Sequence, residues 1–522
     1  MQFQPSPETA APLPPVRVRD PIGAFLRLQG WLWILIRHDA LVPREITPLL
    51  PGWARLGARF LHLFSGREAK AGRPGQRLGA AFERLGPVAI KLGQVLATRA
   101  DIFGTEFARD LGRLKDNLPP FPIDQARREV ERSLGRPVEA LYTDFGEAVA
   151  AASLAQAHPA YLADGRKVAV KVLRPGVERR VAQGLDSMRL GARLTRRFVP
   201  LLRRLEPEAF VETIARALQL ELDMRLEAAA ASELGEVMAK SGYMSAPAVV
   251  WDGVGKRVLT LTWAEGLPMT DPAAADQPGL DRNQLADNIV RAFLTQALDH
   301  GVFHADLHEG NLFCAAPARA MAVDFGIVGR LGPGERRYLA EILWGFITRD
   351  YPRIARVHFE AGYVPPAHSV ETFAQALRAV GEPVVGKQAS QVSMGRLLGQ
   401  LFEITDLFDM RLRPELILLQ KTMVSVEGVA RRLNPDHDLW EAAKPVVEQW
   451  IQRELGPKAQ VRDVVQEGIE TLRALSKWAR APHEPRMVVV ETRVAARWPA
   501  VLSILAAAGA LAALVLSTGV LS

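Results

Sequence analysis

The residues of this chain whose types and spacing favour chemistry lie close together in HADLHEGNLFCAAPARAMAVDFG, residues 304–326. Asp306 and Asn311 form the pattern HxDxxxxN, and Asp324 opens a DFG tripeptide 13 residues after Asn311. Carboxylate and amide oxygens suit Mg²⁺, a hard cation that binds nucleotide phosphates through one or two carboxylates. We expect Asn311 and Asp324 to hold Mg²⁺, and Asp306 to receive or orient a hydroxyl proton during phosphoryl transfer.

A β-hairpin is the element that we expect to carry these ligands. The runs NLFC and MAVD flank the turn AAPARA. An antiparallel register that pairs Leu312 with Val323 sets Asn311 opposite Asp324. The two predicted metal ligands would then lie side by side.

A zinc site is the alternative interpretation, with His304 and His308 as a pair of ligands at i and i+4. It requires a helix, whereas Gly301 and Gly310 bracket the segment and no third ligand is obvious. We therefore expect the two histidines to hold the shape of the loop.

The run KVAVKVL, residues 167–173, supplies a cation for the same chemistry. Period two puts Lys171 on one face of a strand with Ala169, and three valines on the other. A nucleotide base could lie under Ala169 while Lys171 reaches phosphates; an exposed edge-strand lysine is the simpler alternative. Where a glycine-rich phosphate loop is expected upstream, small residues stand instead: Ala150, Ala151, Ala152 and Ser153.

An acidic helix is predicted for LQLELDMRLEAAAASEL, residues 218–234, carrying Glu221, Asp223 and Glu227. Asp223 and Glu227 are spaced i and i+4, and like charges at this spacing repel unless a cation faces them. Lys171 is one candidate partner, and a solvated acidic face is the alternative. The next strand, RVLTLTWAEG, ends near Glu265.

Together these segments resemble the motifs of the UbiB family of atypical protein-kinase-like proteins, also called aarF-domain-containing kinases, from about Gly79 to Arg330. LGPVAIKLGQVLATRADIF resembles the family's KxGQ motif, AAAS its alanine-rich nucleotide loop, and ELD its ExD motif. HADLHEGN departs from the usual HADPHPGN at Leu307 and Glu309, which predicts a change in loop stiffness rather than in chemistry. The KxGQ and ExD positions are Lys91, Gly93, Gln94, Glu221 and Asp223.

The resemblance implies an α+β, atypical protein-kinase-like bilobal fold with an N-terminal helical KxGQ extension that packs over the site. It implies ATP and Mg²⁺ as cofactors, an ATP-hydrolysing or kinase activity, and a contact between Lys91 and Glu221. It also implies a role in ubiquinone or other isoprenoid lipid metabolism, with quinone-biosynthesis intermediates or enzymes as partners. The residues expected around the nucleotide are Ala150, Ala151, Ala152, Ser153, Ala169, Lys171, Glu227 and Glu265.

Two rival functions use the same residues differently. A pseudoenzyme scaffold would bind nucleotide without turnover and organise other enzymes, and replacement of Asp306 would then leave its function intact. A polyprenylphenol hydroxylase, as in older naming of the family, needs a site for oxygen chemistry. The sequence has neither a GxGxxG after a strand nor an obvious haem or iron ligand set, which argues against the hydroxylase.

Charge and composition favour a membrane partner. The 522 residues carry a net charge of +7, and Arg-rich helical stretches supply much of the excess. We expect an anionic membrane surface rather than nucleic acid as the partner. FLRLQGWLWILI, residues 25–36, is apolar but too short to span a bilayer, so we interpret it as an interfacial or core helix. The single cysteine, Cys314, excludes a disulfide framework.

The C-terminal 23 residues, 500–522, are apolar or small, and about 20 such residues cross a bilayer. Arg493, Arg497 and Trp498 border them, which is typical of a cytoplasmic face. We predict a C-terminal transmembrane helix and a single-pass protein of the inner (cytoplasmic) membrane with its catalytic domain in the cytoplasm. A buried C-terminal helix is the alternative, and small residues along the segment would permit homo-oligomers.

The predicted organisation places strands between about 148 and 266, with helices before, within and after them. We divide the chain into a flexible tail (1–20), an N-terminal helical extension with the KxGQ motif (21–120), a sheet-containing lobe with a helical insertion and the ExD motif (121–268), a helical lobe (269–482), a juxtamembrane segment (483–498) and a transmembrane helix (499–522).

Overall fold

The computed structural model describes residues 18–49, 51–66, 69, 72–97, 104–112, 114, 119–198, 206–382, 404, 407–410 and 414–456. All of them belong to one compact unit, Met1–Gly456. The predicted juxtamembrane segment and transmembrane helix lie outside the described residues, as does most of the predicted tail. Among the helices of the described residues, none combines the length and the apolar character needed to cross a bilayer.

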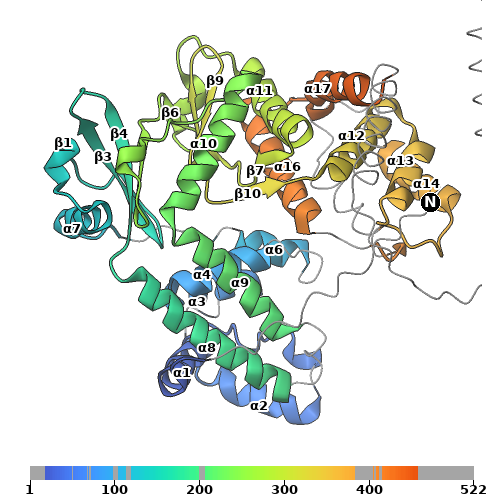
Figure 1. Cartoon of the computed structure of the whole chain (residues 1–522). Coiled ribbons are helices and arrows are strands. Elements are labelled where there is room, and N and C mark those ends of the chain that lie inside the picture. The colour runs from blue at the N-terminus through green and yellow to red at the C-terminus, as the bar shows by residue number, and fades with distance from the viewer. Residues whose placement is uncertain are drawn as a thin grey trace, which may run out of the picture. The chain divides into compact units, whose positions relative to one another are not determined.

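A five-stranded antiparallel sheet forms the first lobe (Figure 1). Its strands run in the order β1 (Tyr142–Phe145), β3 (Ala155–Leu162), β4 (Lys167–Leu173), β5 (Val258–Thr262), and β2 (Ala150–Ala151) pairs with β3. The three valines of β4 are fully buried and pack with helix α7 (Ile123–Leu134). The predicted period of two in β4 is confirmed, and it leaves Ala169 and Lys171 on the other face. Strand β1 was not predicted.

The N-terminal extension and the insertion after β4 pack together. The extension comprises α1 (Pro21–Arg37), α2 (Gly52–His62), α3 (Pro74–Leu85), α4 (Pro87–Ala97) and α6 (Thr105–Leu111). Helices α8 (Val177–Phe198) and α9 (Pro207–Glu221) of the insertion contact α1 and α4, as Figure 1 shows. The predicted extension and the helical insertion of the sheet-containing lobe therefore share one helical layer, although α1 and α8 lie far apart in the sequence.

The predicted acidic helix is wrong in one respect, because it is two helices. Helix α9 ends at Glu221, and α10 (Met224–Ser241) begins after Asp223, whose carboxylate caps it by accepting from the Arg225 amide. Asp is a favoured N-cap because its side chain satisfies an amide that has no partner within the helix. Asp223 also pairs with the Arg225 guanidinium, so its repulsion with Glu227 is relieved locally.

The second lobe is mainly helical. Its helices are α11 (Arg282–Thr295), followed by a π-turn (Gln296–His300), α12 (Pro333–Thr348), α13 (Tyr351–Glu360), α14 (Val370–Gly381), α16 (Pro414–Leu433) and α17 (Leu439–Glu454). Short strands frame the site: β7 (Val302–His304) pairs with β10 (Val328–Arg330), and β8 (Leu312–Ala315) pairs with β6 (Leu267–Pro268) and β9 (Arg319–Ala322). Leucine, valine and aromatic side chains of α11, α16 and α17 share the main core.

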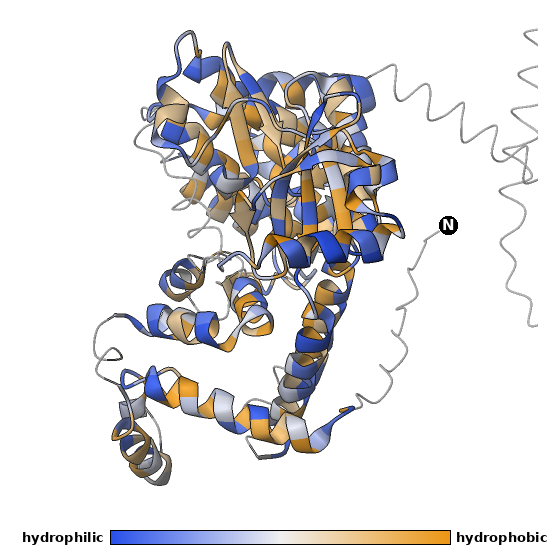
Figure 2. Ribbon diagram, turned by 90° about the vertical axis from the view of Figure 1, so that its left-hand side faces the viewer, coloured by the Kyte–Doolittle hydropathy of each residue, from blue (hydrophilic) through white to orange (hydrophobic). Residues whose placement is uncertain are grey.

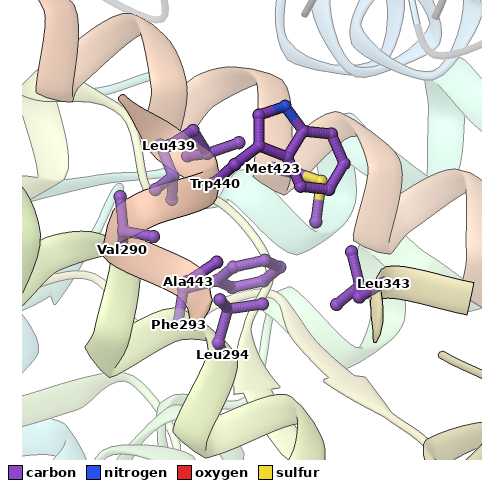
Figure 3. Close-up of a pocket in the computed structure, with 9 residues that line it drawn as sticks. Val290, Phe293, Leu294, Leu343, Met423, Leu439, Trp440 and Ala443 are labelled. Atoms are coloured by element: carbon purple, nitrogen blue, oxygen red, sulfur yellow. The ribbon is translucent and has the colours of Figure 1, made fainter. Parts of the chain in front are cut away.

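An apolar pocket lies within this helical lobe, between α11, α12, α16 and α17 (Figure 3). Phe293, Leu294, Met423 and Trp440 are among its lining residues, and no polar side chain converges on it. Its free volume is about 10 Å³, room for roughly one water molecule. We interpret it as imperfect core packing that is separate from the charged residues of the candidate site.

Candidate active site

Lys171, Glu227 and Asp324 form a chain of charges that joins the two lobes. The Lys171 ammonium donates to both Glu227 oxygens, at 2.7 and 3.0 Å, and lies 3.3 Å from Asp324 Oδ1. Burial acts to lower the pKa of Lys171, but the charges of Asp324 and Glu227 outweigh it and raise that pKa. The lysine is therefore a permanent cation, and the predicted partnership of Lys171 with the acidic helix is confirmed for Glu227.

Asp324 has a backbone geometry that is uncommon for residues other than glycine. Its φ is +63°, in the left-handed region, and its carboxylate accepts a 3.3 Å hydrogen bond from the Gly326 amide. The charge of Lys171 lowers the pKa of Asp324. Because its side chain is 51% exposed, this carboxylate can reach a ligand in the site.

His304 is a buried structural residue of the loop that precedes Asp306. Its Nδ1 accepts from the Asp306 amide at 3.1 Å, so its Nε2–H donates to the Val323 carbonyl at 3.4 Å. Burial lowers the pKa of His304, which keeps the ring neutral. The segment from His304 to His308 is not helical, and the His304 ring nitrogens are engaged, so the geometry does not support the zinc alternative.

Asp306 is held from two sides. Lys421 Nζ donates to Asp306 Oδ1 at 3.0 Å, and His308 Nε2 lies 3.6 Å from Oδ2. Burial would raise the pKa of Asp306, but the contacts with His308 and Lys421 outweigh it and lower that pKa well below its usual range. Asp306 in turn raises the pKa of His308.

Lys421 was missed by the sequence analysis. It lies 115 residues from Asp306, on helix α16. In the sequence LLQKTMVSVEG it resembles an ordinary lysine on a helix surface. Only the packing of α16 against helix α11 of the same lobe brings it to the loop. No local signal in the sequence indicates this contact.

The hairpin that carries Asn311 and Asp324 exists, but its predicted register is wrong by one residue. Leu312 pairs with Ala322, and the Val323 amide donates to the Asn311 carbonyl at 2.9 Å. Asn311 therefore faces Val323 rather than Asp324. The Asn311 side-chain NH₂ donates to the Asp306 carbonyl at 3.0 Å, which ties the proposed metal ligand to the proposed base.

The residues present fit a Mg²⁺ ion that phosphates and waters help to hold. Asp324 offers a half-exposed, ionised carboxylate, and Asn311 uses its NH₂ group internally, which turns its side-chain oxygen to another partner. Among the described residues no cluster of three or more His, Cys, Asp and Glu side chains could hold a metal alone. One carboxylate and one amide oxygen are donors that suit Mg²⁺ bound together with nucleotide phosphates and water.

The alanine-rich segment lies at the edge of the sheet beside Lys171. Ala150 and Ala151 pair with Ala157 and Gln156, and Ser153 is buried. Ala157 itself pairs with Lys171. The segment thus runs one strand away from the lysine, where a phosphate loop is required.

Two further residues were predicted to lie at the nucleotide, Ala169 and Glu265, and only Ala169 lies on the same strand face as Lys171. Ala169 is half-buried on β4, on the same face as Lys171, as predicted. Glu265 lies past the end of β5, is exposed, and pairs with Arg319 at 3.1 Å. Its side chain is therefore engaged with the hairpin.

The KxGQ segment forms helix α4 and meets the end of α9. Lys91 forms an ion pair with Glu221, as the resemblance implied. Burial raises the pKa of Glu221 against the opposing charge of Lys91. A Cβ at Gly93 would clash with Leu114 and Phe82, so this glycine permits close helix packing. Gln94 is half-buried on the same helix.

The fold and the site define a protein-kinase-like ATP-site architecture: a strand lysine paired with a helix glutamate, an HxDxxxxN loop and a DFG segment. A family model described as the ABC1 atypical kinase-like domain matches residues 113–358, and one described as the UbiB helical domain matches residues 377–438. The chain belongs to the UbiB family, and its relatives are named as kinases.

"Probable protein kinase UbiB" of Marinobacter nauticus is 39% identical over 447 residues, which cover 83% of this chain and 80% of the relative. The protein of the same name from Pseudomonas aeruginosa is 37% identical over 465 residues, covering 88% and 87%. The solved complex of Rv3197 with erythromycin from Mycobacterium tuberculosis superposes with a TM-score of 0.49 at 22% identity, covering 76% of this chain and 98% of that one.

Proposed function

We propose that this protein is a membrane-associated UbiB-type atypical kinase or ATPase that supports ubiquinone biosynthesis. It would act by ATP hydrolysis or by phosphorylation of a small lipid-like molecule. The observation that carries the proposal is the contact of Lys171 with both Glu227 and Asp324, because it joins a sheet cation to the DFG carboxylate as phosphoryl transfer requires.

Each residue has a role that follows from its surroundings. ATP supplies the transferred phosphoryl group, and Mg²⁺ neutralises phosphate charge. Lys171 orients phosphates, Asp324 and Asn311 hold the metal, and Asp306 orients the acceptor hydroxyl or water. Because phosphoryl transfer depends mainly on position and charge, these groups need no covalent chemistry of their own.

The position of the KxGQ helix supports water or a small molecule, rather than a protein, as the acceptor. Lys91 on α4 pairs with Glu221 at the break between α9 and α10, and α10 carries Glu227. The extension is thereby fastened next to the charge chain. A peptide would have to displace it, whereas water or a small molecule would not.

The test is phosphate release from Mg²⁺-ATP by the full chain, with and without liposomes of anionic lipid. We expect turnover that rises with liposomes and is lost in Asp324→Asn, which removes a charge that Lys171 contacts. Nucleotide binding with no phosphate release under any lipid condition would reject the enzymatic proposal.

One observation favours the scaffold as a second candidate function. Both oxygens of Asp306 have a neighbour, Lys421 or His308, and such contacts hold its pKa low. A carboxylate with a strongly lowered pKa accepts a proton poorly. If Asp306→Asn retains the biological function of the chain, the scaffold replaces the enzyme.

Association with an anionic membrane surface is supported by the exposed apolar side chains of the N-terminal helices, which we call the α1–α2 apolar face. Figure 2 colours the ribbon of these helices by the hydropathy of each residue. Trp33 of α1 contacts Phe64, which contacts Phe60 of α2, so exposed aromatic side chains of the two helices meet. Its exposed apolar members are Ile22, Phe25, Leu26, Trp33, Leu56, Phe60, Leu63 and Phe64.

The charges around the α1–α2 apolar face suit anionic lipid. Arg37 and Arg59 are exposed on its two helices. The acidic residues in the described residues 18–66 each have an arginine partner: Asp20 with Arg27, Asp39 with Arg77, and Glu45 with Arg77. Apolar and aromatic side chains bordered by arginines are typical of helices that lie in a lipid interface. This face would hold the chain at the surface independently of the predicted C-terminal anchor.

A further inference from the structure

Helix α16 is tied to the loop that carries Asp306 by three side chains. Lys421 Nζ donates to Asp306 Oδ1 at 3.0 Å, the Thr422 hydroxyl lies 3.0 Å from the Ala305 carbonyl oxygen, and Arg432 forms an ion pair with Glu309. The loop lies in the residues matched by the kinase-like domain, and α16 in those matched by the helical domain. A second domain thus supplies side chains to the proposed reaction centre.

The Arg432 contact also accounts for a departure from the family's usual loop. Glu309 stands where the usual HADPHPGN has proline, and here its carboxylate binds α16. Leu307 stands at the other proline position and is fully buried. The loop is therefore held by packing and by an ion pair in place of two rigid prolines.

Lys421 differs from the other two tethers because it alone reaches a carboxylate of the proposed chemistry. The Thr422 side chain is buried and hydrogen-bonds to a backbone carbonyl. Arg432 pairs with Glu309, which is not one of the predicted catalytic or metal-binding residues. The Lys421 side chain is 39% exposed, and Asp306 is its carboxylate partner among the described residues. Val426, Val429 and other α16 residues are buried in the main core, which fixes the backbone from which Lys421 extends.

Two lysines therefore lie at two functionally different positions. Lys171 contacts Asp324, on the predicted side of the phosphates and metal. Lys421 contacts Asp306, on the predicted side of the acceptor. A change at Lys421 should alter the transfer step while the binding of nucleotide stays the same.

We propose that Lys421 is a positioning residue for phosphoryl transfer, contributed by the helical domain, which fixes the Asp306 carboxylate toward the acceptor. The inference rests on the proposed function. In the step, Asp306 orients the acceptor O–H, the acceptor oxygen bonds to the γ-phosphorus as the bond from that phosphorus to ADP breaks, and the acceptor proton passes to an oxygen of the transferred phosphoryl group. With water as the acceptor, the products are ADP and inorganic phosphate.

The experiment compares full-length wild type with Lys421→Met, Lys421→Arg and the control Lys444→Met, an exposed lysine of the neighbouring helix α17. Hydrolysis of Mg²⁺-ATP gives kcat and KM. Binding of ADP with and without aluminium fluoride gives an equilibrium readout, because that complex mimics the transferred phosphoryl group. Circular dichroism and thermal unfolding report whether each variant is folded.

We expect Lys421→Met to lower kcat by about tenfold to a hundredfold, with KM for ATP and the affinity for ADP within about twofold of wild type. Affinity for the ADP–aluminium fluoride complex should fall with kcat. Lys421→Arg should recover part of both, and Lys444→Met should match wild type. If Lys421→Met does not fold, the test uses Lys421→Arg, for which a lowered kcat with unchanged ADP affinity would support the inference.

Three results would overturn the inference. Unchanged or faster turnover in Lys421→Met makes the contact structural or inhibitory, and leaves the proposed enzyme standing. Parallel loss of ADP affinity and turnover makes Lys421 part of the nucleotide site. Wild type that neither hydrolyses ATP nor prefers the aluminium fluoride complex rejects the proposed function and the inference together.

Discussion

The ammonium of Lys171 on β4 lies 2.7 Å from the nearer carboxylate oxygen of Glu227 on α10. The Glu227 side chain is only 8% exposed, and 56 residues of chain separate the two partners. Much of that separation is helices α8 and α9, which pack with the N-terminal extension. The pair therefore connects the sheet to helix α10 and, through Asp324, to the DFG segment.

Glu227→Gln should weaken both folding and turnover. The amide keeps the size of the side chain but leaves the Lys171 ammonium with only the half-exposed Asp324 as an anionic partner. We expect a loss of about 1–3 kcal/mol in the free energy of unfolding and a fall in ATP turnover of about tenfold or more. Urea unfolding and phosphate release measure the two effects.

Glu233→Gln is the matched control for that change. Glu233 is on the same helix but its pair with Arg330 is exposed, so its removal should alter the free energy of unfolding by no more than about 0.5 kcal/mol. Equal effects of the two substitutions would show that the buried charge chain has no special importance.

His358 should make the second lobe sensitive to acid. Its Nδ1 lies 2.8 Å from the Ile354 carbonyl oxygen, and burial lowers its pKa to about 4. An unfolded histidine titrates near about 6.5, so between these values the unfolded chain binds a proton that the folded chain does not. The stability from this group is complete above about pH 6.5 and is lost as the pH falls toward about 4.

His358→Gln should flatten that dependence by up to about 1.4 kcal/mol per pH unit, the limit for one proton. Urea unfolding at pH 7, 6 and 5 gives the slope for wild type and variant. A residual slope is expected because burial also lowers the pKa of His158, His300 and His304. Identical slopes in the two proteins would contradict the assignment.

Gly93→Ala should loosen the KxGQ helix. Its Cβ would overlap the side chains of Leu114 and Phe82, so these side chains or α4 must shift. We expect a loss of about 1–3 kcal/mol in the free energy of unfolding, typical of overpacking. Gly57→Ala in α2 is the control: nothing lies near its Cβ, so the better helix former should be neutral or stabilising by up to about 1 kcal/mol. A destabilised Gly57→Ala or an unaffected Gly93→Ala would refute the packing argument.

The sequence predicted local chemistry well and distant contacts poorly. The period of two in β4 places Lys171 because side-chain alternation is a property of the strand itself. The KxGQ–ExD contact followed only from resemblance. The one-residue error in the hairpin arose because the turn after Ala315 is shorter than assumed, and a one-residue slip exchanges every partner. Lys421 could not be found, since only the packing of α16 brings it to Asp306.

The break before α10 shows a second kind of error. Helical periodicity continues through Asp223, so apolar spacing predicted one helix there. Asp competes for the backbone as an N-cap, and that local preference ended α9 at Glu221. The break matters for the site, because it lets Glu221 at the end of α9 pair with Lys91 while Glu227 on α10 pairs with Lys171.

The α1–α2 apolar face should enter lipid when the full chain is placed in liposomes of anionic lipid. Leu56 is 72% exposed there, and the natural Cys314 is buried, so Leu56→Cys can be labelled selectively with an environment-sensitive dye. We expect the dye's emission to shift to the blue and to be quenched by brominated lipid. Trp251→Cys is the control, because Trp251 is also exposed but lies in a turn that packs against β5. Added salt should weaken the shift, since Arg37 and Arg59 contribute attraction that ions screen. If the dye at Leu56→Cys stays in water, the face does not bind lipid and must have another occupant. If the dye responds in lipid-free protein as the protein concentration rises, that occupant is another copy of the chain.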